Sequence, residues 1–164
     1  MTKSALFDKF CQEFATVFGI GKLGPAPGTL ATAVTLPFAF VLDLGGIYFY
    51  MIATVAIVLL GIVAAERTEH LLGIHDSKTI VIDEVAGFLI AKTWLPATWP
   101  AYMGAFLLFR LLDIKKPLFI GTLDKKVPGG LGVMADDIAA GLVANLILQI
   151  IYTQTTWLGV QISG

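Results

Sequence analysis

Two pairs of adjacent acidic residues are unusual because each lies within an apolar stretch of the chain. Asp83-Glu84 occurs in IVIDEVAGFLI, and Asp136-Asp137 occurs in GVMADDIAAGLVANLILQII. Both stretches contain the pattern Asp-x-x-Ala-Gly, which ends at Gly87 in the first and at Gly141 in the second. Ionised side chains close to hydrocarbon are costly and are usually partnered or functional. The two pairs are therefore the first candidates for a functional site.

A divalent cation would explain why carboxylates gather in this way. Like charges repel unless a cation joins them, and ligands that offer only oxygen suit Mg²⁺. Asp137, Gly141 and Asn145 fall on one stripe of a helix, and a small residue beside an acid lets a second helix approach closely. We therefore expect the two acidic helices to face each other around a Mg²⁺ site. Its expected ligands are Asp83, Glu84, Asp136, Asp137 and, from the preceding loop, Asp76. The alternative is that Asp136 or Asp137 simply caps the start of its helix.

Basic residues that could hold a phosphate occur in FRLLDIKKPLF, which contains Arg110, Lys115 and Lys116. An arginine near the end of an apolar helix, followed by lysines, is suited to gripping phosphate. The alternatives are an i,i+3 ion pair between Arg110 and Asp113, and lysines that anchor to lipid head groups. Thr29 either caps the first apolar helix or contributes its hydroxyl to a metal or phosphate.

Composition indicates the class of protein that must position these residues. The 164-residue chain is 57% hydrophobic and only 14% charged, and its mean hydropathy is +0.83. These values predict an integral membrane protein, and the length predicts a single domain over residues 1–164. The single cysteine, Cys11, excludes an intramolecular disulfide and a cysteine zinc cluster.

The hydropathy pattern predicts an all-α fold, a polytopic membrane helical bundle. Residues 29–42 are apolar but short for a span, residues 44–65 carry no charge and form the clearest transmembrane helix, and residues 138–164 are also uncharged. Between them, residues 80–95 and 101–114 are predicted to form a hairpin of short helices, broken at Pro96 and Pro100. This hairpin is either re-entrant or supported by neighbouring helices.

The N-terminal stretch, residues 4–19, has the spacing of an amphipathic helix. It is too polar to span, so it either lies in the membrane interface or packs on the rest of the protein. The loop that follows contains Gly19-x-Gly21-x-x-Gly24, which matches the dinucleotide fingerprint only formally. No strand is predicted before it and Pro25 follows at once, so we reject a dinucleotide site.

Basic residues predict the orientation in the membrane. If the chain crosses at residues 29–42, 44–65 and 138–164, ten of its eleven basic residues lie on one side, and only Lys92 lies near the other. The positive-inside rule assigns that side to the cytoplasm. The acidic pairs belong to the same side, so a cytoplasmic site at the edge of the lipid is expected.

Four stretches together resemble one family, phosphatidylglycerophosphatase A: GIGKLGPAPGTLAT, HDSKTIVIDEVAG, FRLLDIKKP and GGLGVMADDIAAG. These bacterial membrane enzymes remove the terminal phosphate from phosphatidylglycerophosphate. The resemblance implies Mg²⁺ as cofactor, a phospholipid substrate, and a multi-pass protein of the bacterial cytoplasmic (inner) membrane whose site faces the cytoplasm. Nucleic acid is not an expected partner, and the sequence does not predict the oligomeric state.

The expected catalytic residues are Asp83, Glu84, Asp136, Asp137 and Arg110, with phosphate contacts from Arg110, Lys115, Lys116 and Thr29. The nucleophile is either water or an aspartate that forms an aspartyl-phosphate. A CDP-alcohol phosphotransferase is a rival enzyme, but its Asp-x-x-Asp-Gly-x-x-Ala-Arg run is absent. The remaining alternative is a small metal-ion transporter or channel lined by buried carboxylates, which predicts acids near the membrane midplane.

Overall fold

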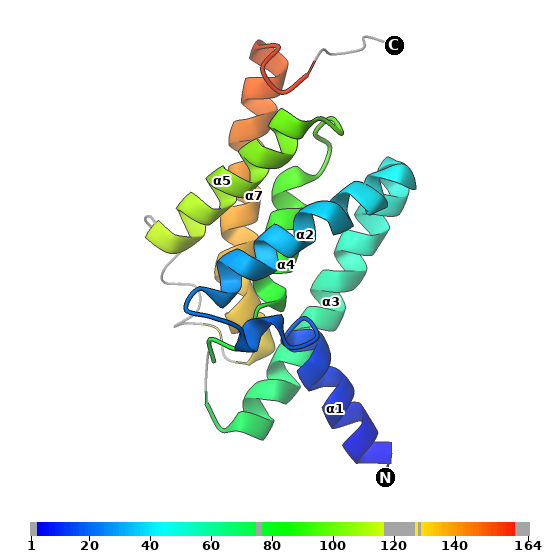
Figure 1. Ribbon diagram of the computed structural model, residues 1–164, viewed down its shortest axis with the longest axis vertical. Helices are drawn as coiled ribbons and strands as arrows, with labels where there is room; N and C mark the ends of the chain where they lie inside the picture. Colours follow the sequence, from blue (N-terminus) through cyan, green and yellow to red (C-terminus); the bar gives the residue numbers. More distant parts are fainter. Residues whose placement is uncertain (1–2, 75–76, 117–126, 128, 160–164) are drawn as a thin grey trace.

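The computed structural model describes residues 3–74, 77–116, 127 and 129–159 of the chain. Within these residues the chain forms six α-helices and one short 3-10 helix, and no strand (Figure 1). The helices are α1 (Lys3–Ala15), η1 (Ile20–Lys22), α2 (Pro27–Leu44), α3 (Ile47–Leu72), α4 (Ile82–Lys92), α5 (Trp99–Lys115) and α7 (Gly130–Gln154). The predicted all-α class is confirmed.

Three of these helices, α2, α3 and α7, are long and apolar enough to cross a membrane. Their outward faces carry large exposed apolar side chains such as Phe38, Ile52 and Leu146, as expected where the surrounding medium is hydrocarbon. The predicted multi-pass bundle is therefore confirmed.

Helix α3 continues beyond the span expected from the sequence. The sequence predicted a transmembrane helix over residues 44–65, but the helix runs on to Leu72. The cause is packing against α1: Arg67 Nε donates to Asp8 Oδ1 at 2.7 Å, and Cys11 and Ala15 of α1 are buried. Of the two alternatives for α1, packing on the protein is thus observed, although Phe7 remains half exposed.

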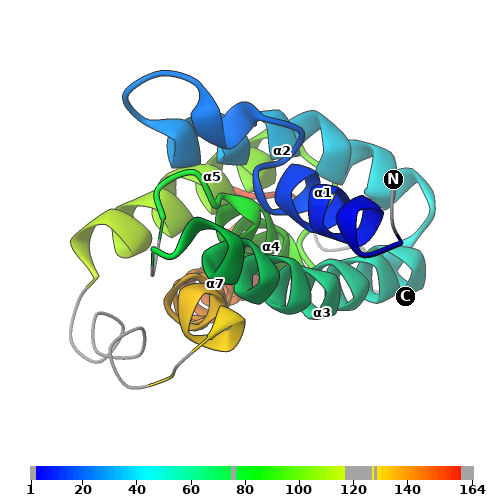
Figure 2. The same cartoon turned by 90° about the horizontal axis from the view of Figure 1, so that it is seen from below.

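Helices α4 and α5 form the predicted hairpin, and α4 is enclosed by its neighbours (Figure 2). Nine of its eleven residues are buried. At 1.5 Å per residue, α4 is only about 16 Å long and cannot cross about 30 Å of hydrocarbon alone. Contacts with α2, α3, α5 and α7 support it instead, so its backbone never has to face lipid.

Two glycines allow α4 and α7 to cross in close contact. A Cβ on Gly141 would overlap the carbonyl oxygen of Gly87, and a Cβ on Gly87 would lie 2.8 Å from the carbonyl oxygen of Asp137. The side chain of Asn145 then donates through Nδ2 to the carbonyl oxygens of Ala91 at 3.1 Å and Thr93 at 2.7 Å. The predicted close approach of the two acidic helices is confirmed.

Helix α7 begins earlier than the acidic pair that was expected to open it. Its first residue is Gly130, and its N-cap is Gly129 with a φ of 75°, a left-handed value that favours glycine. A Cβ on Gly130 would collide with the carbonyl oxygen of Ile62 in α3. Asp136 and Asp137 therefore lie in the second turn of α7, and the interpretation of either residue as a helix cap is wrong.

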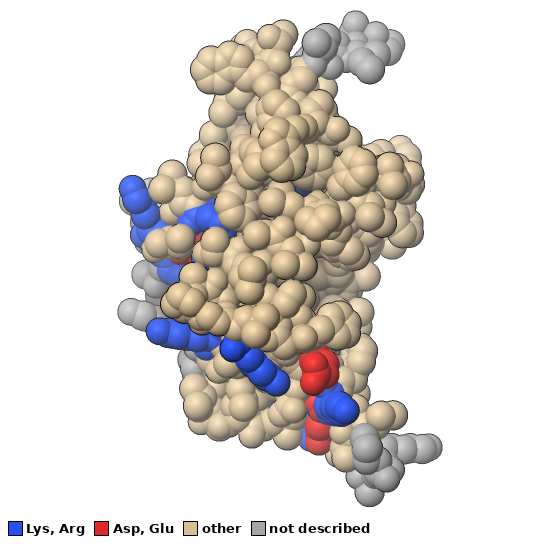
Figure 3. All heavy atoms as spheres, in the orientation of Figure 1, with Lys and Arg blue, Asp and Glu red and all other residues tan. Residues whose placement is uncertain are grey.

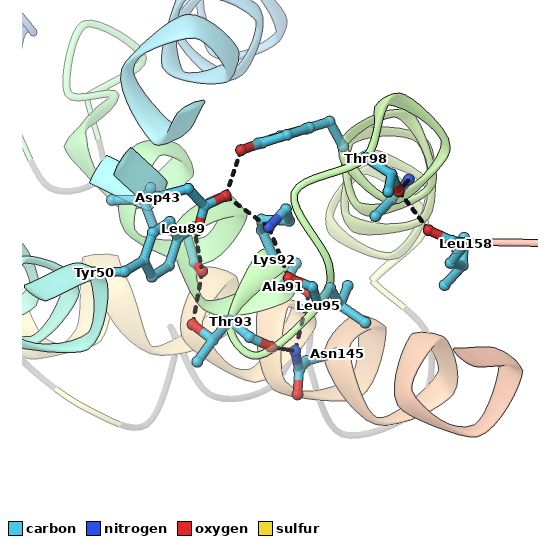
Figure 4. Close-up of polar contacts among 12 residues, drawn as sticks. Asp43, Tyr50, Leu89, Ala91, Lys92, Thr93, Leu95, Thr98, Asn145 and Leu158 are labelled. Carbon is cyan, nitrogen blue, oxygen red and sulfur yellow. Dashed lines mark hydrogen bonds and ion pairs between the residues drawn. The ribbon is translucent and has the colours of Figure 1, made fainter. Parts of the chain in front are cut away.

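A second polar cluster lies at the opposite end of α4, around Lys92 (Figure 4). The Lys92 side chain is only 1% exposed. Its Nζ donates to Asp43 Oδ2 at 2.9 Å and to the carbonyl oxygen of Leu95 at 3.1 Å, and it lies 4.5 Å from the centre of the Tyr102 ring. The Tyr102 hydroxyl also donates to Asp43. This cluster ties α2, α4 and α5 together.

Candidate active site

The centre of the candidate site is a cluster of three carboxylates. Asp83 and Glu84 lie in the first turn of α4, and Asp137 faces them from the second turn of α7. One oxygen from each of the three lies within 4.8 Å of the others. The helices can bring these acids together because Gly87 and Gly141 leave no side chain between them.

Burial raises the pKa of both acids of α4. Removal from water raises the pKa of Asp83 well above its ordinary value, and the neighbouring carboxylates of Glu84 and Asp137 raise it further. Burial is also the main cause of the raised pKa of Glu84. The N-terminal end of α4 offsets part of this cost, because its dipole favours negative charge and the backbone N–H of Glu84 donates to Asp83 Oδ1 at 3.0 Å.

Asp136 has a different partner from the other three predicted acids. Its Oδ2 forms an ion pair with Lys116, and its Oδ1 accepts a hydrogen bond from the backbone N–H of Asp137 at 3.1 Å. The structure thus brings together three of the four acids around one point, and holds the fourth beside them against a lysine.

Arg110 links α5 to the first turn of α2 and to the acidic cluster. Its Nη2 donates to Thr29 Oγ1 at 3.0 Å, and its Nη1 forms an ion pair with Asp113 and lies 3.8 Å from Glu84 Oε1. The i,i+3 pair with Asp113 that the sequence offered as an alternative therefore exists. It orients the guanidinium toward the site rather than removing it from the site.

The first turn of α2 fits closely against the acidic cluster. A Cβ on Gly28 would overlap Glu84 Oε1, so only glycine leaves room for this carboxylate. Two buried atoms at the same place, Glu84 Oε2 and Arg110 Nε, have no hydrogen-bond partner among the residues described. Buried polar atoms are normally satisfied, so an unpartnered carboxylate oxygen and an unpartnered guanidinium N–H indicate a place for ligands. Three carboxylates with a spare oxygen fit a hard cation such as Mg²⁺.

These residues line a cavity of about 730 Å³. The cavity also takes in the loop before α2 and the segment before α4. Its charged lining, as far as the described residues go, consists of Lys78, Arg110, Lys116, Asp83, Glu84, Asp113, Asp136 and Asp137. Figure 3 shows basic side chains on the side of the molecule where α2 begins and α5 ends, while the coloured part of the upper end of this view shows no charged side chain.

Not all of the residues predicted to contact phosphate lie at the cavity. Arg110, Lys116 and Thr29 line the cavity, whereas Lys115 is exposed and does not. Asp76, predicted as a further metal ligand, lies outside the described residues. The sequence predicted Lys78 and Asp113 on the cytoplasmic side, but it assigned no site role to Lys78 and no role to Asp113 beyond its pairing with Arg110. The i,i+3 spacing from Arg110 was the signal for Asp113, but nothing local distinguished Lys78 from other exposed lysines.

Comparison with known proteins identifies the family of the chain. The family model of phosphatidylglycerophosphatase A matches residues 13–152. Phosphatidylglycerophosphatase A of Haemophilus influenzae is 37% identical over 136 residues, which cover 82% of this chain and 83% of the relative. The Escherichia coli protein of the same name is 33% identical over 138 residues, covering 84% of this chain and 80% of the relative.

A third relative, from Bacteroides thetaiotaomicron, carries the provisional name phosphatidylinositol-3-phosphatase. It is 34% identical over 146 residues, which cover 82% of this chain and 89% of the relative. No solved structure matches the chain. With a family match over most of its length, and with three helices suited to crossing a membrane, the chain is a membrane protein that belongs to the phosphatidylglycerophosphatase A family of phosphatases.

Proposed function

We propose that this chain is a Mg²⁺-dependent lipid phosphatase that hydrolyses phosphatidylglycerophosphate to phosphatidylglycerol and inorganic phosphate. The observation that carries the proposal is the cluster of Asp83, Glu84 and Asp137 beside Arg110. In this cluster one carboxylate oxygen, Glu84 Oε2, and one guanidinium nitrogen, Arg110 Nε, have no partner among the described residues. Such a pair of atoms matches a cation and an anion bound next to each other, as in the complex of a metal ion with a phosphate.

The charge of the cavity supports the need for a cation. Among the described residues, its lining contains three basic and five acidic side chains, a net charge of −2 when all are ionised. A phosphate monoester also carries negative charge, so the cavity without a cation would repel it. One or two divalent cations held by Asp83, Glu84 and Asp137 would remove this repulsion. Asp136, paired with Lys116, is placed to support them or to ligate directly.

The side chains of the cavity then have distinct roles in hydrolysis. Arg110 donates to the phosphoryl oxygens, and its contacts with Asp113 and Thr29 hold the guanidinium in position. When bound, Mg²⁺ supplies positive charge beside the phosphoryl group and a Lewis acid for the reacting water. We assign the nucleophile to water because Asp83 and Asp137 are needed as ligands.

In this reaction the water oxygen attacks phosphorus and the bond from phosphorus to the glycerol oxygen breaks. A carboxylate of the cavity takes one proton of the attacking water and later releases it to solvent, and the leaving alkoxide takes a proton from solvent water as it departs. Phosphatidylglycerol and inorganic phosphate are the products.

The relatives' names support the choice of substrate. Two of them name phosphatidylglycerophosphate and one names a phosphatidylinositol 3-phosphate as substrate. Both lipids carry a phosphate monoester on a polar head group that a phosphodiester joins to diacylglycerol. A site at the edge of the lipid suits such a molecule, since its acyl chains stay in the leaflet while its monoester reaches the carboxylates. The distribution of basic residues supports a cytoplasmic orientation in the bacterial inner membrane.

The test is release of phosphate by the purified protein in detergent micelles that contain phosphatidylglycerophosphate. We expect hydrolysis with Mg²⁺ and none after EDTA, with recovery when Mg²⁺ is restored. Phosphatidylinositol 3-phosphate in parallel micelles tests the choice between the two named lipids. Absence of phosphate release with either lipid, together with Mg²⁺ flux in proteoliposomes, would favour the transporter alternative.

A further inference from the structure

The cavity contains one basic side chain whose role the proposed reaction does not explain. Lys78 lines the cavity from the segment that joins α3 to α4. The other two cations of the cavity are held by its acids: Arg110 pairs with Asp113, and Lys116 pairs with Asp136. Lys78 forms no ion pair with any carboxylate that the structure describes. Of the three described cations of the cavity, it is therefore the one most readily available to a ligand.

The backbone around Lys78 is held in place by contacts on both sides. The backbone N–H of Val81 donates to the carbonyl oxygen of Ala15 in α1 at 2.9 Å, and that of Ile80 donates to the carbonyl oxygen of Ser77 at 2.8 Å. Gly21 fits against the carbonyl of Thr79 so closely that a Cβ there would overlap the oxygen. The base of the Lys78 side chain thus has a fixed position, while its exposed end can adjust to a ligand.

The proposed substrate has a second phosphate, the phosphodiester, which the acidic cluster does not bind. When the monoester lies beside Arg110, the phosphodiester lies one glycerol unit away, toward the lipid. A monoanion at that position needs a separate cation, and the positive charge of lysine on its flexible stem can supply one. A cavity of about 730 Å³ falls within the range of about 300–1,000 Å³ that is typical of sites for whole small ligands.

We propose that Lys78 binds the phosphodiester of the substrate and so favours lipids whose head group carries two phosphates. Lys78 would then be a residue for substrate specificity, separate from the group that holds the monoester. This inference rests on the proposed function, because it assigns a role to a part of that substrate.

The experiment compares Lys78→Ala with Lys22→Ala in the micelle assay. Lys22 is an exposed lysine of η1 that does not line the cavity, so it removes the same charge nearby. An exposed ion pair contributes up to about 1 kcal/mol, so we expect Lys78→Ala to raise KM for phosphatidylglycerophosphate about two- to fivefold. We expect kcat and the inhibition constant of inorganic phosphate to stay unchanged. Lys78→Arg should restore much of the KM.

Three outcomes would overturn the assignment. An unchanged KM in Lys78→Ala would show that the lysine does not contact substrate. An equal rise in KM and in the inhibition constant of inorganic phosphate would place Lys78 at the monoester instead. An equal effect of Lys22→Ala would show a general attraction of anionic micelles. Failure of the proposed function is distinct, because the wild-type protein would then release no phosphate at all.

Discussion

Both ends of α4 carry buried charge. The charge at one end is fully paired, whereas the charge at the other end is not. At the Lys92 end, the ammonium has a carboxylate, a carbonyl oxygen and an aromatic ring around it. At the Asp83 end, three carboxylates face one another, and Glu84 Oε2 and Arg110 Nε have no partner among the described residues. One short helix therefore connects a satisfied cluster to an unsatisfied one.

This difference indicates a structural role for the Lys92 cluster and a ligand-binding role for the acidic cluster. A buried polar group that is fully paired ties elements together, and the Lys92 cluster does so for α2, α4 and α5. Buried like charges without a counter-ion cost stability unless a ligand supplies what is missing. The acidic end is thus unfavourable by itself, and the cation and phosphate of the proposed function would offset this cost.

The largest effect is expected from Asp137→Asn at the acidic end. The substitution keeps the shape of the side chain but removes a charged ligand, so we expect phosphatase activity to fall at least about a hundredfold. Thermal unfolding in detergent, without a divalent cation, should show a stability equal to or above that of the wild type, since repulsion decreases. If this variant and Asp83→Asn both keep wild-type activity, the site is wrongly assigned.

At the other end of α4, Lys92→Met should lower stability rather than activity. It leaves Asp43 buried without its counter-ion, and breaking a buried ion pair in this way typically costs about 3–5 kcal/mol. We expect a lower free energy of unfolding in detergent, while kcat per folded molecule stays within about twofold. Arg67→Met is the matched control: its pair with Asp8 is 40% and 23% exposed, so its loss should cost at most about 1 kcal/mol.

A smaller effect on both stability and activity is expected where α4 crosses α7. In Gly141→Ala, the added methyl group would overlap the Gly87 carbonyl and push apart the helices that carry Asp83 and Asp137. Overpacking of this kind costs about 1–3 kcal/mol, and activity should fall with it. Gly104→Ala is the control, because its methyl group would meet only flexible leucine side chains, at 3.2 and 3.5 Å. Equal behaviour of the two variants would contradict the importance of the crossing.

The smallest expected effect is a pH dependence of stability that arises from the acidic cluster. Because burial raises the pKa of Asp83 in the folded protein, its protonated form is favoured there, and cation-free stability should fall as pH rises above the ordinary carboxyl value of about 4. A cation binds the ionised form, so Mg²⁺ should raise the unfolding midpoint more at pH 8 than at pH 5. The Asp83→Asn variant should lose most of this difference. A Mg²⁺ effect that is the same at both pH values would contradict the prediction.

Much of the fold could be predicted because its signals are local. Hydropathy and helical period indicated the spans and the α4–α5 hairpin, and the glycines of the two Asp-x-x-Ala-Gly patterns indicated the close crossing. The limits of α3 and α7 could not be predicted in this way. Helix α3 extends because α1 packs on it, and α7 begins at Gly130 because that residue fits against the backbone of α3. Both causes involve residues far away in the chain.

The sequence by itself determined that this is an all-helical membrane protein, which residue types could hold a metal and a phosphate, and which family they resemble. Only the tertiary structure decided that Asp137 joins Asp83 and Glu84 while Asp136 pairs with Lys116, and that Lys78 lines the cavity while Lys115 does not. The physical reason is one of range. Helix formation and hydropathy depend on neighbours along the chain, whereas the grouping of charges depends on the angle and depth at which separate helices cross.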